Sequence, residues 1–210
     1  MKSPMKSAIV FFGSRPLATG VLEELARANI TPSLIVTSPD APQGRKHTLT
    51  PPEAKVWAEK HGIPVLQPAT LKNGDEIAPL LNTDWDLFIV ASYGKILPKN
   101  VLSLPKRGTL NVHPSLLPKF RGPSPIRSAI LKDARETGVS IILLDEEIDH
   151  GPIIAAASIE IAPKDWPMRA TALEELLAHA GGELLAETIP EWLAGTITPE
   201  EQNHAEATFS

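Results

Sequence analysis

The chain has 210 residues, of which 42% are hydrophobic, and a formal net charge of −5. This length and composition suit one sizeable domain with a real core, so a disordered chain is excluded, and the negative charge argues against nucleic-acid binding by the whole surface. The chain lacks cysteine, which excludes disulfides and thiolate sites and makes a cytoplasmic location the default expectation. At its beginning, the apolar run 8–12 is too short for a signal peptide. No run approaches the ~18 apolar residues of a membrane span, so no membrane partner is expected.

A strand, a helix and a second strand follow one another in the first 38 residues. Residues 7–13 form an apolar run that ends in glycine, which is typical of a buried parallel strand. Apolar residues then recur at helical spacing from Leu17 to Leu25, and residues 33–38 form the second strand. This order predicts a right-handed βαβ unit. Its first turn has no GxGxxG pattern, so a dinucleotide site is poorly supported.

Strands and helices continue to alternate along the rest of the chain. We expect a Pro-rich basic loop at 39–52, a helix over 51–62, an edge strand at 63–67, a buried strand at 86–92 followed by a turn at 93–98, a strand at 109–113, a helix at 123–131, a strand at 138–144, its hairpin partner at 153–161 and a long closing helix from Ala170. The pattern predicts an α/β fold: a doubly wound, Rossmann-like, mostly parallel sheet of about seven strands, with some antiparallel pairing late in the chain. We assign residues 1–194 to one domain and 195–210 to a polar tail or linker.

The stretch GTLNVHPSLLPKFRGPSP, residues 108–125, is the first candidate site. Asn111 and His113 stand two positions apart in a predicted strand, so both side chains should point to the same face. The prolines that follow end the strand and stiffen the loop. Ligands of open α/β sheets bind at such strand ends. An amide and a titratable ring at this place therefore indicate a site, although a lone His near Pro is more often a turn residue.

The acidic turn 145–151 supplies a third candidate side chain. Asp145, Glu146 and Glu147 have the pattern of a solvated turn. Asp149 differs because Gly151 and the proline after it allow a sharp reversal, which could aim its carboxylate back across the sheet. If it reaches His113, it would favour the protonated imidazole. An Asn, a His and an Asp that converge above a sheet can polarise a carbonyl and move a proton, which is the chemistry of acyl transfer.

Two other kinds of site are less well supported. A Ser-His-Asp hydrolase would use Ser92, His113 and Asp149, but the first glycine of the G-x-S-x-G motif is replaced by Val90. The chain order also differs from that of α/β-hydrolases. A metal site is not expected, because the six histidines show no ligand spacing.

Several motifs together resemble the folate-dependent formyltransferases, and most closely the methionyl-tRNA formyltransferases. They are NVHPSLLP followed by FRGPSP at 111–125, PDAPQGR with TP at 39–51, ASYGKILP at 91–98, and TGV at 137–139 with the turn that ends in Asp149 and Gly151. The resemblance covers about residues 7–210. It implies transfer of a formyl group from 10-formyltetrahydrofolate to the amino group of charged initiator tRNA, in translation initiation, by a monomer without a metal.

The resemblance also assigns roles to individual residues. Asn111, His113 and Asp149 match the catalytic residues. The expected folate-binding residues are Ser92, Tyr93, Gly94, Ile96, Leu97, Leu143, Leu144 and Glu147. The expected substrate- or tRNA-binding residues are Gly13, Ser14, Leu17, Arg45, Lys46, Ser115, Leu116, Leu117 and Pro118. In the family, the bond that matches Leu117–Pro118 is typically cis.

Two departures from the family pattern leave the acceptor open. The family usually has G-T-P-[DE]-F after the first strand, whereas this chain has Leu17 in place of the aromatic residue that helps to hold a methionyl side chain. The family also has a C-terminal barrel domain, which would follow the linker. Formylation of a nucleotide-linked amino sugar by the same three residues is therefore the main alternative. A folate- or tRNA-binding module without catalysis is a more distant one.

Overall fold

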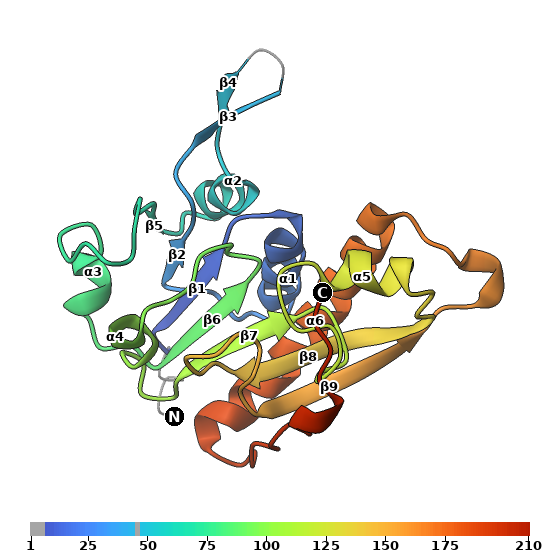
Figure 1. Cartoon of the computed structure of the whole chain (residues 1–210). Helices are drawn as coiled ribbons and strands as arrows, with labels where there is room; N and C mark the ends of the chain where they lie inside the picture. The colour runs from blue at the N-terminus through green and yellow to red at the C-terminus, as the bar shows by residue number, and fades with distance from the viewer. Residues whose placement is uncertain (1–6, 45–46) are drawn as a thin grey trace.

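The computed structural model describes residues 7–44 and 47–210, which form a seven-stranded sheet with helices on one side and loops with short helices on the other (Figure 1). The strand order is β5-β2-β1-β6-β7-β8-β9. The pairs from β5 to β7 are parallel, whereas β8 runs antiparallel to both β7 and β9. The structure thus confirms the predicted mostly parallel α/β sheet with antiparallel pairing late in the chain.

The elements follow in this order: β1 (Ile9–Gly13), α1 (Pro16–Arg27), β2 (Leu34–Val36), β3 (Ala41–Gln43), β4 (Thr48–Thr50), α2 (Glu53–Lys60), β5 (Val65–Leu66), α3 (Ala78–Leu81), β6 (Leu87–Ala91), α4 (Lys99–Leu102), β7 (Thr109–His113), α5 (Pro125–Leu131), β8 (Glu136–Leu143), β9 (Ile153–Glu160), the 3₁₀ turn Pro163–Asp165, α6 (Ala170–Ala194) and the 3₁₀ turn His204–Glu206. None of the helices in the described ranges is long and apolar enough to cross a membrane.

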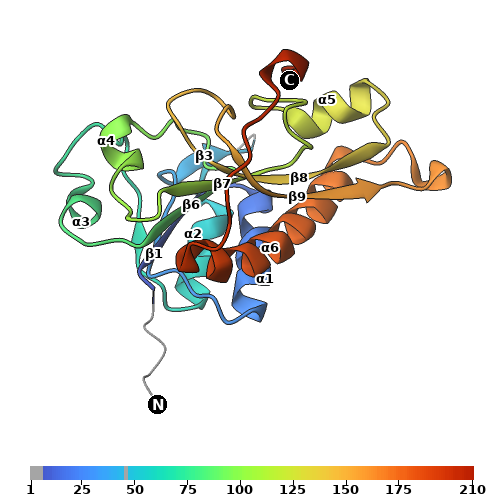
Figure 2. The ribbon, with the colours of Figure 1, turned by 90° about the horizontal axis from the view of Figure 1, so that it is seen from below.

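The two faces of the sheet carry different neighbours because side chains alternate along each strand. Figure 2 shows α1, α2 and α6 together on one side of the sheet. Leu110 and Val112 of β7 belong to the core on this side, with Phe11 of β1. A second cluster, which includes Phe12, covers the other face under α3, α4 and their loops. Asn111 and His113 alternate with Leu110 and Val112, so they point to this second face.

Helices α1 and α6 pack closely because small residues lie where they meet. A Cβ on Gly20 would lie 2.6 Å from the Ala178 Cβ, and one on Gly182 would lie 2.7 Å from the Glu24 Cβ. Leu17, at the start of α1, is only 3% exposed and packs into the same core. The helix-covered face is thus a tightly packed apolar layer that supports the sheet from behind.

Two predicted loop regions contain more structure than the sequence indicated. The prediction that residues 39–52 have no regular structure is wrong, because β3 and β4 pair there as an antiparallel hairpin that projects from the body (Figure 1). Because its short strands are mostly exposed, their sequence lacks the alternating apolar residues by which a strand is usually predicted. The short helices α3 and α4 were also not predicted, since each has only four residues.

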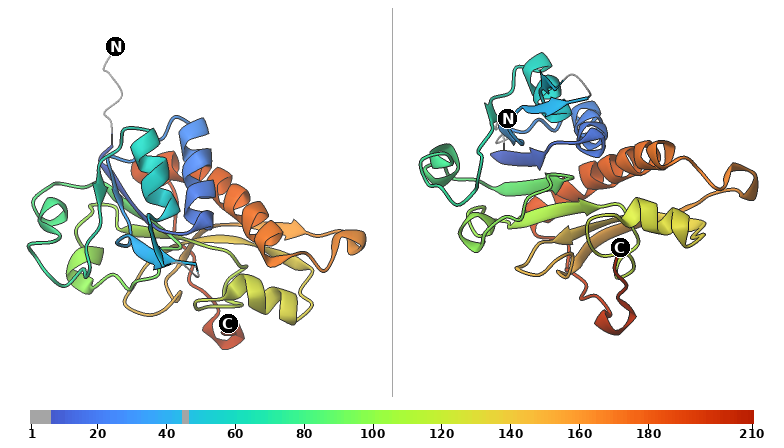
Figure 3. Two further views of the ribbon diagram at one scale, coloured as in Figure 1. Left: turned by 90° about the horizontal axis from the view of Figure 1, so that it is seen from above. Right: turned by 45° about the horizontal axis from the view of Figure 1, so that its top comes forward.

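The tail 195–210 lies against the domain instead of extending from it. From the end of α6 it passes the β9 edge of the sheet to the opposite side, where it ends near α5 (Figure 3). Glu200 exchanges backbone hydrogen bonds of 2.7 and 2.8 Å with Ile153, and the backbone N–H of Arg121 donates to the Thr208 carbonyl at 2.8 Å. This polar segment is held by hydrogen bonds to distant residues, which its own sequence does not reveal.

Candidate active site

The three polar side chains from β7 and the acidic turn meet on the face of the sheet opposite α1 and α6. Asn111 Nδ2 donates to Asp149 Oδ1 at 3.4 Å, and His113 Nδ1 lies 3.6 Å from the same oxygen. The His113 side chain is 5% exposed and that of Asp149 is 13% exposed. The sequence therefore placed these residues correctly relative to one another, and the structure brings an amide, an imidazole and a carboxylate to one point.

The imidazole of His113 has a defined orientation because one of its nitrogens faces a carbonyl. Nε2 lies 2.9 Å from the Phe120 carbonyl oxygen, which can only accept a hydrogen bond. Nε2 therefore carries a proton, and in the neutral ring Nδ1 has the free lone pair. Because Nδ1 faces the Asp149 carboxylate, it can take up a proton and form an imidazolium beside a negative charge.

The backbone holds the Asp149 carboxylate in place from two sides. The Gly122 N–H donates to Asp149 Oδ2 at 2.7 Å. Asp149 itself has φ 49°, in the left-handed region, which a non-glycine residue keeps only where its surroundings hold it. Two residues later the turn passes so close to β8 that a Cβ on Gly151 would lie 1.9 Å from the Leu143 carbonyl oxygen. Only glycine permits the reversal that aims Asp149 at β7.

The Pro-rich loop after His113 is fixed by a buried hydroxyl of β8. Ser140 Oγ donates to the Ser115 carbonyl at 2.8 Å and accepts from the Leu117 N–H at 3.0 Å. Ser115 is itself buried, and the Leu117–Pro118 bond is cis. Leu116, Leu117 and Pro118 line a small pocket together with Lys119, Phe120, Glu136 and Thr137. The expected substrate-side residues 115–118 thus form a rigid loop next to His113.

The hydrogen bonds of the described residues do not support a Ser-His-Asp hydrolase. In such a triad one ring nitrogen faces the aspartate and the other takes the serine proton, but in His113 that other nitrogen, Nε2, faces the Phe120 carbonyl. In the described ranges, no hydrogen bond joins Ser92 to His113. Ser92 instead has φ 47°, and its carbonyl accepts a hydrogen bond from the Ser14 N–H at 3.3 Å.

The expected folate-binding residues lie in the loop after β6 and at the end of β8 with the turn that follows it. In the loop after β6, Gly94 has φ 81°, Ile96 is 80% exposed, and Leu97 is buried. Tyr93 is buried as well; burial raises the pKa of its hydroxyl to about 12, and within the described part of the chain that hydroxyl has no hydrogen-bond partner. Leu143 is half-buried at the end of β8, where it lies close to Gly108.

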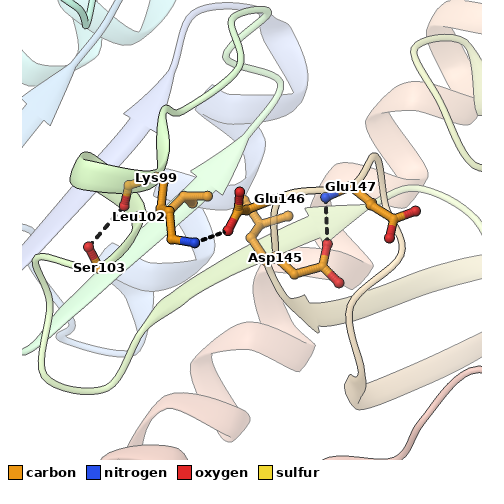
Figure 4. Close-up of a pocket in the computed structure, with 7 residues that line it drawn as sticks. Lys99, Leu102, Ser103, Asp145, Glu146 and Glu147 are labelled. Atoms are coloured by element: carbon orange, nitrogen blue, oxygen red, sulfur yellow. Dashed lines mark hydrogen bonds and ion pairs between the residues drawn. The ribbon is translucent and has the colours of Figure 1, made fainter.

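A pocket of about 400 Å³ opens between α4 and the acidic turn (Figure 4). It is lined by Lys99, Leu102, Ser103, Leu144, Asp145, Glu146 and Glu147. Two of these residues, Leu144 and Glu147, were expected to bind folate. Lys99 Nζ lies 2.5 Å from Glu146 Oε1 across the pocket, and the hydrogen bond to this carboxylate raises the pKa of Lys99. The pocket therefore combines leucine side chains with acidic groups, on the turn that carries Asp149.

The expected substrate-side residues of the first turn have different surroundings. Ser14 Oγ accepts hydrogen bonds from Thr37 Oγ1 and the Ser38 N–H, each at 3.1 Å, so it joins the ends of β1 and β2. Gly13 is buried at the end of β1, and Leu17 is enclosed in the core, where it presents almost no surface to a ligand. Arg45 and Lys46 lie outside the described residues.

Sequence reasoning missed several groups that hold the site together. The Phe120 carbonyl and the Gly122 N–H act through the backbone, which no residue type reveals. Arg121 is buried and binds Gln202 of the tail, which its place in a Pro-rich loop of the sequence does not indicate. Gln202 had no signal at all, because its partners are far away in the sequence.

Comparison with known proteins places this geometry in a family. A model of the formyl transferase family matches residues 5–189. The chain belongs to the formyl transferase family. It is 42% identical over 202 residues to a methionyl-tRNA formyltransferase of Geobacillus sp. (strain WCH70) and 41% identical to that of Bacillus subtilis (strain 168). Both alignments cover 96% of this chain, but it spans only 63% of the length of these relatives.

Solved structures show the same fold at low sequence identity. Glycinamide ribonucleotide transformylase 1 from Symbiobacterium toebii has a TM-score of 0.74 and 16% identity, and the match covers 97% of this chain and 98% of that one. The N-formyltransferase from Helicobacter canadensis, in complex with folinic acid and dTDP-3-aminofucose, has a TM-score of 0.70 and 18% identity. That match covers 97% of this chain and 70% of the other. At this identity these structures show that the chain has the formyltransferase fold, and they do not identify the acceptor of the formyl group.

Proposed function

We propose that this chain transfers a formyl group from 10-formyltetrahydrofolate to the amino group of initiator methionyl-tRNA. The observation that carries the proposal is the convergence of Asn111, His113 and Asp149. It occurs in a chain whose similarity to methionyl-tRNA formyltransferases, 42% over 202 residues, is far above that to the sugar or nucleotide enzymes that share the fold. A cytoplasmic monomer that acts on charged initiator tRNA is part of this proposal.

Each of the three side chains has a role that follows from its geometry. The bond from Asn111 to Asp149 is long, at 3.4 Å, so the amide is free to donate to an oxygen that gains negative charge. The attacking amine must lose a proton, and Nδ1 of His113 is the nitrogen able to accept it. Asp149 stabilises the resulting imidazolium and keeps the ring oriented.

The residues around the site fit a folate. The folate would supply the formyl carbon as the electrophile. A flat heterocycle with polar edges needs apolar walls and a few hydrogen-bonding groups. The pocket beside α4 offers leucine side chains and acidic groups, and it lies on the turn that ends at Asp149. We infer that Leu144 and Glu147 hold the folate there, together with the loop 92–97, which leads from β6 towards α4.

An acceptor panel tests the proposal directly. The native chain would be incubated with 10-formyltetrahydrofolate and, in separate reactions, charged initiator tRNA, nucleotide-linked amino sugars and glycinamide ribonucleotide. Formylation of the methionyl-tRNA at the highest kcat/KM is the expected result. A higher kcat/KM for an amino sugar would replace the tRNA by the alternative acceptor. Folate binding without turnover on any acceptor would indicate a binding module.

A further inference from the structure

Gln202 of the tail is a buried side chain that uses its whole amide in hydrogen bonds near Asp149. It is 5% exposed. Its Nε2 donates to the carbonyl oxygens of Asp149 at 3.0 Å and of Gly151 at 2.7 Å. Its Oε1 accepts from Arg121, at 3.1 Å from Nε and 2.6 Å from Nη2. One side chain from the tail thus joins the acidic turn to the loop that follows His113.

The chemistry of its partners permits only one orientation of the Gln202 amide. Arginine only donates hydrogen bonds, so Oε1 must face Arg121. Backbone carbonyls only accept them, so Nε2 must face Asp149 and Gly151. A carboxylate at this position would keep the bonds to Arg121 but would place an oxygen against two carbonyl oxygens. The position therefore requires an amide, because the side chain must offer both an acceptor for Arg121 and a donor for the two carbonyls.

The two segments that Gln202 joins are the ones that position Asp149. On one side, its bonds span the residue whose φ of 49° aims the carboxylate at β7. On the other side, Arg121 stands between Phe120, whose carbonyl fixes the His113 ring, and Gly122, whose N–H binds Asp149 Oδ2. Arg121 is 4% exposed, and within the described ranges its guanidinium has no carboxylate partner. Gln202 Oε1 accepts two hydrogen bonds from this buried cation, and Arg121 Nη2 also lies 2.8 Å from Nδ1 of His204, another residue of the tail.

We propose that Gln202 is a positioning residue that holds the Asp149 carboxylate, and with it the His113 ring, in the geometry needed for proton transfer. The inference rests on the proposed formyl transfer for its kinetic consequence, but the placement of Asp149 is independent of any acceptor. It also gives the segment 195–210 a function within the site, since its hydrogen bonds to Ile153 and Arg121 hold Gln202 from both ends.

The first test is Gln202→Glu, which has the same shape, keeps an acceptor for Arg121 and replaces the two donated hydrogen bonds by a charged oxygen against two carbonyl oxygens. Because small misplacements of catalytic groups cost up to about 100-fold, kcat should fall by about 10- to 100-fold while KM for folate and acceptor changes little. Asn203→Asp adds the same charge one residue later, at an exposed position whose side chain oxygen still caps the following turn, and should leave both constants unchanged. A kcat for Gln202→Glu equal to that of the control would overturn the proposal.

A double variant separates positioning from general damage. If Gln202 acts through Asp149, then adding Gln202→Glu to Asp149→Asn should cost little further activity, since the two losses share one mechanism. Multiplication of the two losses would show that Gln202 acts elsewhere and would overturn the inference. Gln202→Asn, which keeps both chemical groups on a shorter side chain, gives a second variant for the same measurements should Gln202→Glu fold poorly.

The amide signal of Gly122 provides a measurement without turnover. Its N–H donates a short bond to Asp149 Oδ2, so its proton resonance reports whether the carboxylate stays in place. The resonance should move upfield in Gln202→Glu and stay in Asn203→Asp. An unmoved resonance would overturn the positioning role even if the chain formylates methionyl-tRNA. A moved resonance would support it even if the proposed acceptor is wrong.

Discussion

One face of the sheet is covered by α1 and α6, and its core consists of apolar side chains that interlock across short distances. The other face, at β7 and β8, carries Asn111 and His113 under a layer of loops. The same strand supplies both, because Leu110 and Val112 alternate with the two polar residues. The apolar side chains on the first face stabilise the sheet, and the loops on the second face position the polar groups of the site.

The two faces are held by different forces. On the helix face, burial of apolar surface dominates, and it has no preferred direction. On the loop face, hydrogen bonds from Gly122, Ser140 and Gln202 define where each polar group lies. Directional bonds are suited to a site that must place a carboxylate and a ring to within a fraction of an ångström. Substitutions on the two faces should therefore separate stability from activity.

The largest effect is expected on the loop face, for His113→Ala and Asp149→Asn. Each removes a proton-transfer group or its stabilising charge, so kcat/KM for the formylated acceptor should fall by about 10²- to 10⁴-fold. The midpoint of urea unfolding should stay close to the native value, because neither variant opens the apolar core. His61→Ala, at the exposed end of α2, is the control and should keep native activity. Near-native rates in a folded His113→Ala protein would reject the mechanism.

On the helix face, Gly182→Val should lower the stability of the protein and leave kcat unchanged, which is the opposite of the result on the loop face. A Cβ at this position would lie 2.7 Å from the Glu24 Cβ and 3.1 Å from the Val21 Cα, so α1 and α6 must move apart. Overpacking of this kind costs about 1–3 kcal/mol. Valine is also a better helix former than glycine, so a loss reports the clash and not helix propensity.

Urea unfolding and kcat measured on the same preparations make this comparison. The exposed neighbour Glu183→Val should change the free energy of unfolding by much less than Gly182→Val. For Gly182→Val, kcat of the folded protein should be native. A tenfold loss of kcat would show that the helix face also shapes the site, and the proposed division between the two faces would fail.

The sequence predicted the parts of both faces that depend on local pattern. The alternation in β7 placed Asn111 and His113 together, and the glycine two residues after Asp149 predicted the reversal that brings the carboxylate to them. The remaining parts depend on contacts between distant segments. Ser140 is an ordinary strand residue until the loop 115–117 packs on it, and the partners of Gln202 lie 51, 53 and 81 positions away. Leu17 was expected to meet a substrate, but the position of α1 buries it.

A smaller effect is expected from Arg45→Ala, in the sequence between β3 and β4. The hairpin of β3 and β4 belongs to neither face and projects from the body (Figure 1). If Arg45 holds a phosphate of the tRNA, its removal should lower kcat/KM for methionyl-tRNA and reduce the salt slope by about one contact. The exposed Lys60→Ala, in α2, is the control. Equal kcat/KM and salt slopes for the native and Arg45→Ala proteins would favour an amino-sugar acceptor.

The smallest effect is expected on the pH dependence of stability, and it comes from one buried carboxylate on the helix face. Glu24 of α1 is buried, and its carboxylate bonds His179 Nδ1 of α6 and Arg27 Nη1, each at 2.5 Å. Burial by itself would raise the pKa of Glu24, but the bonds from His179 and Arg27 outweigh it and lower that pKa below its ordinary value. A carboxyl group whose folded-state pKa is lowered stabilises the protein above its unfolded pKa. This contribution is lost as the pH falls through the folded-state value.

The stability of the native protein should therefore decline as the pH falls below about 4.5, and Glu24→Gln should flatten this part of the curve. Urea unfolding between pH 3 and pH 7 measures both. Glu23→Gln, at the adjacent and more exposed position of α1, removes a similar charge without these partners and should leave the slope unchanged. Because Glu24 lies on the helix face, kcat at neutral pH should be native in both variants. An acid slope in Glu24→Gln equal to the native slope would show that the ion pair does not couple α1 to α6.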